Sequence, residues 1–481
     1  MEYVIKGYKP ECLFRYFEEI SQIPRGSGNE KGIADYLVAF AAREGLRCVR
    51  DEYHNVAIFR PASPGCEDKE PLMLQAHTDM VCEKNASVDH DFTKDPLKLV
   101  EKDGFLSADG TTLGGDDGAG VCLILAILSD ATLKTPAVEA LFTVQEETGL
   151  GGAELFDYSV LKAKRVLNLD SEEEGIATAS CAGSFNFSLR LDPDRVRNEN
   201  KCLKISVTGL AGGHSGGDIH RGRKNAILLL GRILSELYVK YPFALISIEG
   251  GNKRNAIPRE AEAVISVFDS DEAAKEVRNV AARIYPVLVK EDRKLKVRVS
   301  KAAKADRAMT LKETSRTLTL LSLIPNGVLG MSASVPGLVE SSSNLGVMRT
   351  AEDGTVDISV YARSSVESET DYIETRMKRL AKASGYEYVF GDRSPGWAFD
   401  PSSKLQKDYV KAFKKVFPNG PEPKIEAIHA GLECGIILEK LGGGDAISIG
   451  PNMRDIHTPS ETLDLKSVER TYLLLKELVQ M

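Results

Sequence analysis

The pattern of hydrophobic and polar positions changes twice along the chain. In the first part, short continuous apolar runs, such as residues 71–76, alternate with stretches of helical spacing, such as residues 13–20. A continuous apolar run of strand length is typical of a strand that is buried on both faces. Strands that alternate with helices favour a largely parallel α/β sheet, and we predict such a domain for residues 1–183.

The elements of this domain follow from apolar spacing and from breaker residues. Asn29 is expected to cap the second helix. The expected helices lie at residues 13–20, 29–44, 118–129 and 151–156. The expected strands lie at residues 47–60, where two short strands fit, and at residues 71–76, 137–145 and 165–170.

Near residue 184 the pattern becomes a strict alternation of apolar and polar positions, which is typical of half-buried antiparallel strands. Strands are expected at residues 184–191, 201–208 and 261–268, with a helix at 224–240. A similar order recurs in strands at 337–349 and 356–362 and a helix at 369–383. We interpret residues 184–396 as an inserted α+β lid domain, and the recurrence leaves open two related subdomains within it.

After residue 397 the α/β pattern returns, with a helix at 403–417, a strand at 446–449 and a long C-terminal helix. Residues 397–481 are therefore expected to complete the first domain. The predicted fold is an α/β catalytic domain, with a mostly parallel central sheet and helices on both faces, that is interrupted by the lid.

Length, charge and cysteine usage narrow the class of protein. At 481 residues the chain exceeds what one hydrophobic core usually supports, and its net charge of −8 argues against nucleic acid or an anionic membrane as a partner. It has no basic and apolar leader and no apolar stretch of roughly 18 residues, so neither a signal peptide nor a membrane span is expected. Eight scattered cysteines without a C-x-x-C pair are typical of reduced thiols, and we expect a cytoplasmic protein.

The apolar run 71–76 ends in His77-Thr78-Asp79. Residues two apart on a strand share a face, so His77 and Asp79 can point the same way. A neutral imidazole is the commonest nitrogen ligand of a divalent metal, and a nearby carboxylate can fix its tautomer. The alternative is a histidine that is merely hydrogen-bonded at a strand end.

Two pairs of adjacent carboxylates follow. Asp116 and Asp117 lie in a glycine-rich turn before a helix, where a phosphate loop would need a lysine instead. Adjacent carboxylates repel each other unless a cation neutralises them, so the turn either binds a metal or is simply solvated. Glu146 and Glu147 end the next expected strand, and a charged surface turn is the alternative there.

Five residues decide between these alternatives, because all fall at or just beyond the carboxyl ends of expected strands, where open α/β sheets keep their sites. They are His77, Asp116, Glu147, Asp170 and His457. Two histidines and three carboxylates suit a pair of zinc ions, or another borderline cation, with one carboxylate bridging. Glu146 is then free to act as a general base. After His457, the sequence Thr458-Pro459-Ser460-Glu461 predicts a capping box at a helix start.

As an ordered set, these residues resemble the M20 family of dinuclear zinc peptidases. The resemblance covers essentially the whole chain. Further segments are similar to the aminoacyl-histidine dipeptidase (Xaa-His dipeptidase) branch of the family. They are Ala76-His77-Thr78-Asp79-Met80-Val81, Asn168-Leu169-Asp170-Ser171-Glu172, Gly212-Gly213-His214-Ser215-Gly216 and His429-Ala430-Gly431-Leu432-Glu433-Cys434-Gly435.

The resemblance implies a role for each position. Asp116 would bridge two zinc ions, which Co²⁺ or Mn²⁺ could replace. His77 and Asp170 would complete one site, and Glu147 and His457 the other. Asp79 would orient His77, Glu146 would be the general base, and the Asp116–Asp117 peptide bond would be cis. In the lid, His214 would stabilise the oxyanion, and Asn255, Arg363, His429 and Gly431 would contact the substrate.

The resemblance further implies hydrolysis of unblocked dipeptides, and of Xaa-His or carnosine-like dipeptides in particular, by a dizinc-activated water. Two alternatives stay open at this point. One is a deacylase or carboxypeptidase that acts on N-acyl amino acids, and the other is a metal-binding scaffold without turnover. The partner would be a small peptide substrate, not nucleic acid or a membrane. The sequence leaves open a homodimer and whether His214 serves its own site or that of a partner.

Overall fold

The computed structural model describes residues 3–481, which fold into two compact units. Unit 1 comprises residues 1–181, 399–427 and 432–481, of which residues 1–2 are outside the described part. Unit 2 comprises residues 182–398 and the short segment 428–431. The chain therefore passes between the units four times, because a four-residue return to unit 2 interrupts the second part of unit 1.

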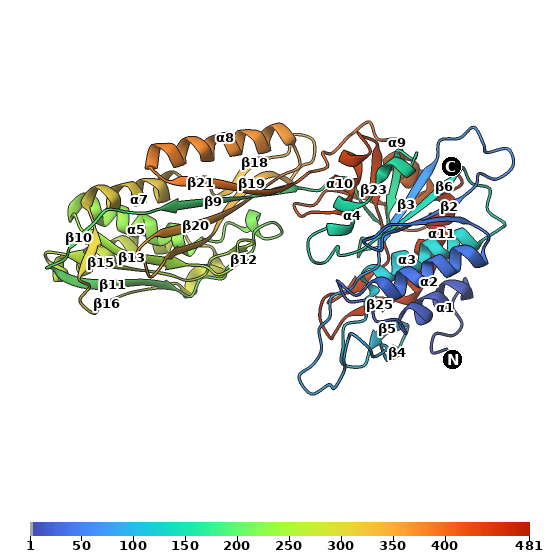
Figure 1. Ribbon diagram of the computed structural model, residues 1–481, viewed down its shortest axis with the longest axis horizontal. Helices are drawn as coiled ribbons and strands as arrows, with labels where there is room; N and C mark the ends of the chain where they lie inside the picture. The colour runs from blue at the N-terminus through green and yellow to red at the C-terminus, as the bar shows by residue number, and fades with distance from the viewer. Residues whose placement is uncertain (1–2) are drawn as a thin grey trace. The chain divides into compact units, whose positions relative to one another are not determined.

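Unit 1 is built on an eight-stranded sheet (Figure 1). Its strands, in spatial order, are β1 (Arg47–Arg50), β2 (Val56–Arg60), β6 (Val138–Thr143), β3 (Leu72–His77), β7 (Arg165–Asn168), β23 (Asp445–Ser448), β8 (Ile176–Thr178) and β22 (Lys424–Glu426). The central strands β6, β3, β7 and β23 are parallel, whereas β1 and β2 pair antiparallel at one edge. The predicted mostly parallel α/β sheet is confirmed.

Helices cover this sheet so completely that every residue of β3, β6 and β7 is buried. This explains the continuous apolar runs of the sequence. One core joins the sheet to α1 (Glu11–Ile20), α2 (Lys31–Arg43), α3 (Gly115–Ser129), α9 (Lys404–Val416) and α11 (Leu465–Leu478). The helices α4 (Gly151–Leu155) and α10 (Glu433–Lys440) pack against each other, and α10 also packs against β23.

A four-stranded sheet adjoins the loops of unit 1. It consists of β24 (Met453–Arg454), β25 (Thr462–Asp464), β5 (Phe105–Ala108) and β4 (Leu99–Lys102). The long polar stretch before Gly115 is therefore ordered by a hairpin of β4 and β5, which pairs with the chain that follows His457.

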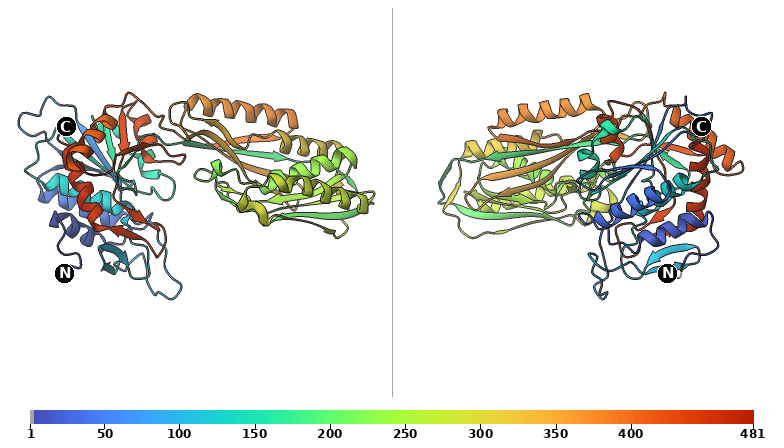
Figure 2. Two further views of the ribbon diagram at one scale, coloured as in Figure 1. Left: turned by 180° about the vertical axis from the view of Figure 1, so that it is seen from behind. Right: turned by 45° about the vertical axis from the view of Figure 1, so that its right-hand side comes forward.

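Unit 2 contains a nine-stranded antiparallel sheet with helices on one side (Figure 2). The strands along its path are β16 (Lys296–Lys301), β11 (Lys201–Thr208), β15 (Ala261–Val267), β13 (Ala244–Gly250), β19 (Val339–Thr350), β20 (Val356–Ser364), β9 (Gly183–Leu191) and β21 (Glu387–Ser394), and β18 (Gly327–Met331) pairs with β19. One core joins it to α5 (Ala226–Lys240), α6 (Ser270–Ile284), α7 (Leu311–Leu323) and α8 (Glu367–Ser384). The two expected repeats thus share a single sheet and a single core.

Short pairings complete unit 2, namely β10 (Arg195–Arg197) with β17 (Arg307–Met309) and β12 (Gly213–His214) with β14 (Ala256–Ile257). The 3₁₀ helices are η1 (Tyr158–Val160), η2 (Ile219–Arg221), η3 (Tyr285–Val287) and η4 (Lys290–Lys294). None of the helices in the described part of the chain combines the length and apolar character that a membrane crossing requires.

Two local predictions are wrong. The N-cap of α2 is Glu30 rather than Asn29, and it makes no side-chain capping bond. The segment 458–461 does not start a helix. The next helix, α11, begins at Leu465 and is capped by Asp464. The Glu461 carboxylate instead accepts backbone N–H groups at the start of α3, so a long-range contact replaces the expected local one.

Candidate active site

The strand ends of unit 1 bring six predicted residues together. We call the group the strand-end cluster, and its members are His77, Asp116, Glu146, Glu147, Asp170 and His457. His77 ends β3, Glu146 and Glu147 follow β6, and Asp170 follows β7. Asp116 lies in the first turn of α3, and His457 lies in the loop between β24 and β25. Parallel strands end at the same edge of a sheet, which is why residues so distant in sequence meet here.

Asp116 lies between two histidines. Its Oδ1 is 3.1 Å from Nε2 of His77, and its Oδ2 is 3.1 Å from Nε2 of His457. Each oxygen of this carboxylate therefore faces a different imidazole, which is the geometry of a bridging ligand.

The cluster consequently has two halves that share Asp116. In the buried half, His77 Nε2 is 3.6 Å from Oδ1 of Asp170, and the two side chains are 1% and 10% exposed. In the exposed half, His457 Nε2 is 2.9 Å from Oε1 of Glu147, and the His457 side chain is 44% exposed. The possible ligand atoms within each half lie within 4.8 Å of one another, so each half could hold one cation.

Asp79 supports both halves. Its Oδ1 lies 3.4 Å from Nδ1 of His77, the ring nitrogen that faces away from Asp116. The same carboxylate accepts the backbone N–H groups of Glu146 (3.0 Å) and Glu147 (3.3 Å) and the hydroxyl of Ser27 (2.7 Å). Asp79 therefore fixes the turn that carries both glutamates.

The pKa values of the cluster indicate that its carboxylates carry more negative charge than nearby cationic groups neutralise. Burial opposes protonation of His77, but Asp170 and Asp116 outweigh burial and raise its pKa well above the usual value. Hydrogen bonds to Asp116 and Glu147 raise the pKa of His457 to about 10. Burial raises the pKa of Glu146 to about 8, and the nearby charges of Glu433 and Glu147 act in the same direction against that of His77. Carboxyl groups this close in a buried site need protons or cations between them.

Two residues around the cluster have a left-handed backbone conformation, and the nearby Asp116–Asp117 peptide bond is cis, as the resemblance implies. Gln145, directly before Glu146, has a φ of 53°, and His457 has a φ of 61°. Such left-handed conformations are unfavourable for residues other than glycine and persist where the surroundings impose them.

Two residues hold these turns, of which the sequence did not single out Arg25 and assigned Glu461 to a local capping box. The guanidinium of Arg25 is fully buried and donates to the carbonyl oxygens of Thr78 (3.0 Å), Asp79 (3.2 Å) and Gly114 (2.5 Å). The carboxylate of Glu461 accepts the N–H groups of the turn that leads to Asp116, at 2.7 to 3.1 Å. Arg25 belongs to a loop after Pro24 that offered no sequence signal beyond its breakers.

The predicted lid residues form a second group, which lies within unit 2. The Arg363 guanidinium carbon lies 4.7 Å from the ring centre of Tyr361, and Nε of Arg363 is buried without a hydrogen-bond partner among residues 3–481. A Cβ atom on Gly216 would lie 3.2 Å from both Arg363 Nε and His214 Cε1. The glycine therefore allows Arg363 and His214 to approach each other.

The ring nitrogens of His214 differ in their partners. Nδ1 accepts the backbone N–H groups of Gly217 (3.0 Å) and Gly216 (3.3 Å), so the ring proton belongs on Nε2. Burial, and then the charge of Arg363, lower the pKa of His214. A neutral imidazole with a free Nε2–H donor results.

His429 and Gly431 belong to the segment that returns to unit 2. His429 Nε2 is 2.6 Å from Oγ of Ser342, the residue that pairs with Arg363 across β19 and β20. Burial, with Arg363, lowers the pKa of His429 to about 4, so this ring is neutral near pH 7. Gly431 is exposed, and its neighbour Ala430 accepts a backbone hydrogen bond from Ala182.

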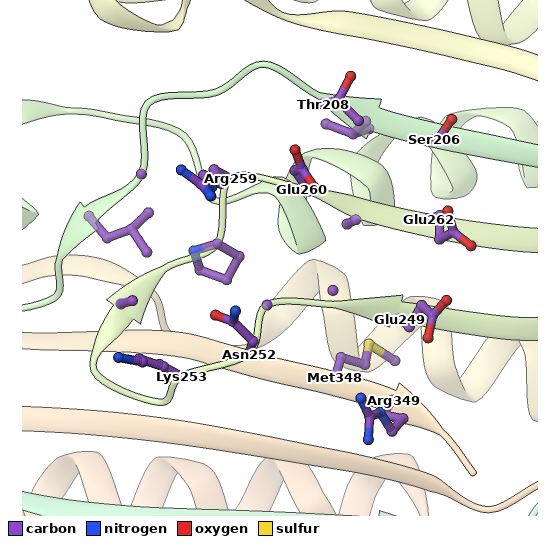
Figure 3. A pocket seen from close by; sticks show the side chains of 18 of the residues that line it. Ser206, Thr208, Glu249, Asn252, Lys253, Arg259, Glu260, Glu262, Met348 and Arg349 are labelled. Atoms are coloured by element: carbon purple, nitrogen blue, oxygen red, sulfur yellow. The ribbon is translucent and has the colours of Figure 1, made fainter. Parts of the chain in front are cut away.

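Asn255 lies in the turn between β13 and β14, and its carbonyl oxygen accepts the N–H of Ser215, next to His214. The Asn344 amide donates to the carbonyl oxygens of Arg254 and Ala256 on either side of it. A cavity of about 590 Å³ adjoins this turn (Figure 3). Its lining includes Asn252 and Lys253 of the turn and carries charges of both signs.

Comparison with known proteins decides the family. The model of Peptidase family M20/M25/M40 matches residues 73–481. The chain belongs to this family. The resemblance drawn from the strand-end motifs is thereby confirmed, and the protein is a hydrolase that acts on peptide bonds.

Named relatives span almost the whole chain. The cytosol non-specific dipeptidase of Escherichia coli (strain K12) is 37% identical over 475 residues, which cover 98% of this chain and 97% of the relative. The crystal structure of aminoacylhistidine dipeptidase from Vibrio alginolyticus is 34% identical, with a TM-score of 0.92 and coverage of 98% and 97%. A tripeptidase from Staphylococcus aureus subsp. aureus mu50, 16% identical with a TM-score of 0.59, shares the fold.

Proposed function

We propose that this M20 peptidase is a dipeptidase with a dinuclear metal centre in its strand-end cluster. The observation that carries the proposal is Asp116, whose two carboxylate oxygens face His77 and His457 at the same distance of 3.1 Å. The names of the two similar dipeptidases support the substrate class.

The residues fit a pair of divalent cations. His77, Asp116 and Asp170 would hold one ion, and Asp116, Glu147 and His457 the other. Oε1 of Glu147 is buried and lies 2.9 Å from Nε2 of His457, so this oxygen and this nitrogen face each other closely enough to bind a common ion. Nitrogen and oxygen donors favour Zn²⁺, and Co²⁺ or Mn²⁺ could replace it.

Glu146 is proposed as the general base. When bound, the two ions would supply Lewis-acid polarisation of the scissile carbonyl and lower the pKa of water. Glu146 would accept a proton from the attacking water and deliver it to the leaving amine. Its backbone N–H is anchored on Asp79, and its carboxylate lies close to possible ligand atoms of His77 and Glu147, where it would face a water between the two ions. Asp79 would also hold His77 in the tautomer that leaves Nε2 free.

Unit 2 would supply the groups that read the substrate. The Nε2–H of His214 is free to donate to an oxyanion. Arg363 has an unpaired donor and a guanidinium plane supported by Tyr361, which suits the free C-terminal carboxylate of a dipeptide. Asn255 would help to hold the substrate, and His429 and Gly431 would line the same region.

The preferred dipeptide is a finer proposal. The resemblance favours Xaa-His substrates, including carnosine-like ones, whereas the relative from Escherichia coli is called non-specific. The word cytosol in that name also supports the cytoplasmic location proposed here. Whether the protein forms a homodimer in which His214 acts on a partner stays a prediction for gel filtration combined with light scattering.

One panel of substrates tests the function. Purified protein of known metal content is assayed with unblocked dipeptides, the same dipeptides amidated at the C-terminus, and N-acyl amino acids. We expect close to two metal equivalents and cleavage of the unblocked dipeptides. A preference for N-acyl amino acids would identify a deacylase, and a loaded protein without turnover would identify a scaffold. Full activity with a single ion would contradict the dinuclear centre.

A further inference from the structure

Glu433 is a buried carboxyl group outside the strand-end cluster. It is the first residue of α10 and is 0% exposed. One of its oxygens, Oε1, has no hydrogen-bond partner among the residues described. Burying a carboxylate with an unsatisfied oxygen costs free energy that an apolar side chain would not. The cost points to a role for the other oxygen.

That oxygen, Oε2, joins two strands. It accepts hydrogen bonds from Nε2 of Gln75 (2.5 Å) on β3 and from Oγ1 of Thr143 (2.8 Å) on β6. Gln75 Nε2 also lies 3.1 Å from Thr143 Oγ1, so the three polar groups form a closed triangle. All three side chains are buried, and the geometry of each is fixed by the other two.

The triangle continues to a third strand. Oε1 of Gln75 accepts a hydrogen bond from Nδ2 of Asn168 (2.6 Å) on β7, and Oδ1 of Asn168 accepts the backbone N–H of Asp170 (3.3 Å). Gln75 lies two residues before His77, on the same face of β3. The hydrogen bonds of this network therefore reach the backbone of Asp170, and through Gln75 the network fixes the end of β3 that carries His77.

The exposed half is held by other contacts. The N–H of Glu147 is bound by Asp79, and His457 lies in a loop with a left-handed backbone. Within the described chain, Glu433 makes no hydrogen bond to either residue or to Asp79. The influence of Glu433 should thus be confined to one of the two halves.

We propose that Glu433 is a positioning residue for the ion held by His77, Asp116 and Asp170. Its carboxylate fixes Gln75 and Thr143 and thereby the ends of β3 and β7 that present the two outer ligands. This role rests on the proposed dinuclear centre. Glu433 itself contacts neither the ions nor the substrate.

Cobalt binding tests the role directly. Metal-stripped, full-length protein is titrated with Co²⁺, and binding is followed by calorimetry and by the visible absorption of the bound ion. His457→Ala removes the exposed half, so the ion that remains reports on the buried half. In both backgrounds, Glu433→Ala is compared with Glu433→Gln, which keeps one acceptor oxygen, and with Glu439→Ala, an exposed glutamate on the same helix.

We expect the wild-type protein to bind two equivalents of Co²⁺. Glu433→Ala should weaken one of the two binding steps by about 10–100-fold, the range for loss of an outer partner of a ligand, and alter the cobalt spectrum in the His457→Ala background. Glu433→Gln should recover much of the affinity, and Glu439→Ala should change neither. With saturating metal, Glu433→Ala should lower kcat more than it raises KM.

Several outcomes would overturn the proposal. Unchanged Co²⁺ binding and spectrum in Glu433→Ala would remove the role of Glu433 and leave the dinuclear centre intact. Equal weakening of both steps would show a general effect on the fold instead of positioning. If Glu433→Ala does not fold, Thr143→Val removes the two bonds of the triangle that involve Thr143, keeps the one between Gln75 and Glu433, and must weaken the same step to a smaller extent. A wild-type protein that binds fewer than two ions would overturn the centre itself.

Discussion

The two halves of the strand-end cluster contain similar proposed ligands but are supported in different ways. His77 and Asp170 end adjacent parallel strands, and a network of buried side chains fixes them. Glu147 and His457 belong to turns, and the His457 side chain is 44% exposed. Asp116 therefore belongs both to a half that buried strands hold in place, which we call the rigid half, and to a half that exposed turns hold, which we call the adaptable half. We expect the rigid half to retain its ion and the adaptable half to exchange it.

The largest expected effect separates the general base from the ligand beside it. Glu146→Gln keeps the shape of the side chain but removes the proton acceptor, so kcat should fall by about 10²–10⁴-fold while both ions remain bound. Glu147→Ala removes a ligand of the exposed half, so metal content and activity should fall together. Steady-state kinetics and elemental analysis of both variants are sufficient. Loss of metal only in Glu146→Gln would mean that the two roles are reversed.

Removal of one histidine at a time tests the two halves against each other. His457→Ala should leave one tightly bound ion, because the buried half keeps His77, Asp116 and Asp170. His77→Ala should weaken its ion by more than about 100-fold, which exceeds the loss for an outer partner. It should also lower Tm, because it disturbs a fully buried site. Metal titration of each variant gives the comparison, and equal affinities would contradict the difference between the halves.

When the wild-type protein is treated with a chelator, the two halves should lose their ions at different rates. The ion at the exposed half should leave first, because water and chelator reach His457, and the ion at the buried half should follow more slowly. Stopped-flow release of Co²⁺ into a chelator should show two phases, with activity lost in the first. A single phase for both equivalents would indicate that the halves open together.

A change in unit 2 should leave both halves loaded. Arg363→Lys keeps the charge but loses the planar fork, so KM for an unblocked dipeptide should rise about tenfold, which corresponds to one charge-assisted hydrogen bond. Metal content should be unchanged. Amidated dipeptides should be poor substrates for the wild-type protein and less affected by the variant. Equal turnover of free and amidated dipeptides would contradict the assignment of Arg363.

The smallest expected effect is on stability against pH. In metal-free protein, the pKa of His457 is raised to about 10 and that of Glu146 to about 8, so the folded state binds more protons than the unfolded chain. The stability that the His457 contacts supply is complete below pH 6.5, the unfolded pKa, and is lost as pH rises through 10. His457→Ala should flatten this loss, which amounts to about a few degrees in Tm because the side chain is half exposed. Metal-loaded protein should show the opposite slope, because the ions require deprotonated ligands.

Much of the fold could be predicted because strands buried on both faces produce apolar runs. Three of the five proposed ligands, His77, Glu147 and Asp170, could be predicted because the ends of the parallel strands β3, β6 and β7 meet at one edge of the sheet. Asp116 and His457 instead follow strands of the four-stranded antiparallel sheet. Glu433 and Gln75 could not be, since they are separated by 358 residues and each is unremarkable in its local sequence. The same limit explains Glu461, whose spacing from Thr458 fits a local capping box but whose carboxylate binds a turn far earlier in the chain.

The order of the strands in unit 1 has a consequence for biosynthesis. Strand β7 pairs with β23, which is near the end of the chain, whereas the nine-stranded sheet of unit 2 is complete at β21. During translation, unit 2 can therefore complete its core before β23, the neighbour of β7, has been synthesised. An apolar strand with an unpaired edge is prone to aggregation in that interval. The insertion thus delays completion of unit 1 until the C-terminal part of the chain has been synthesised.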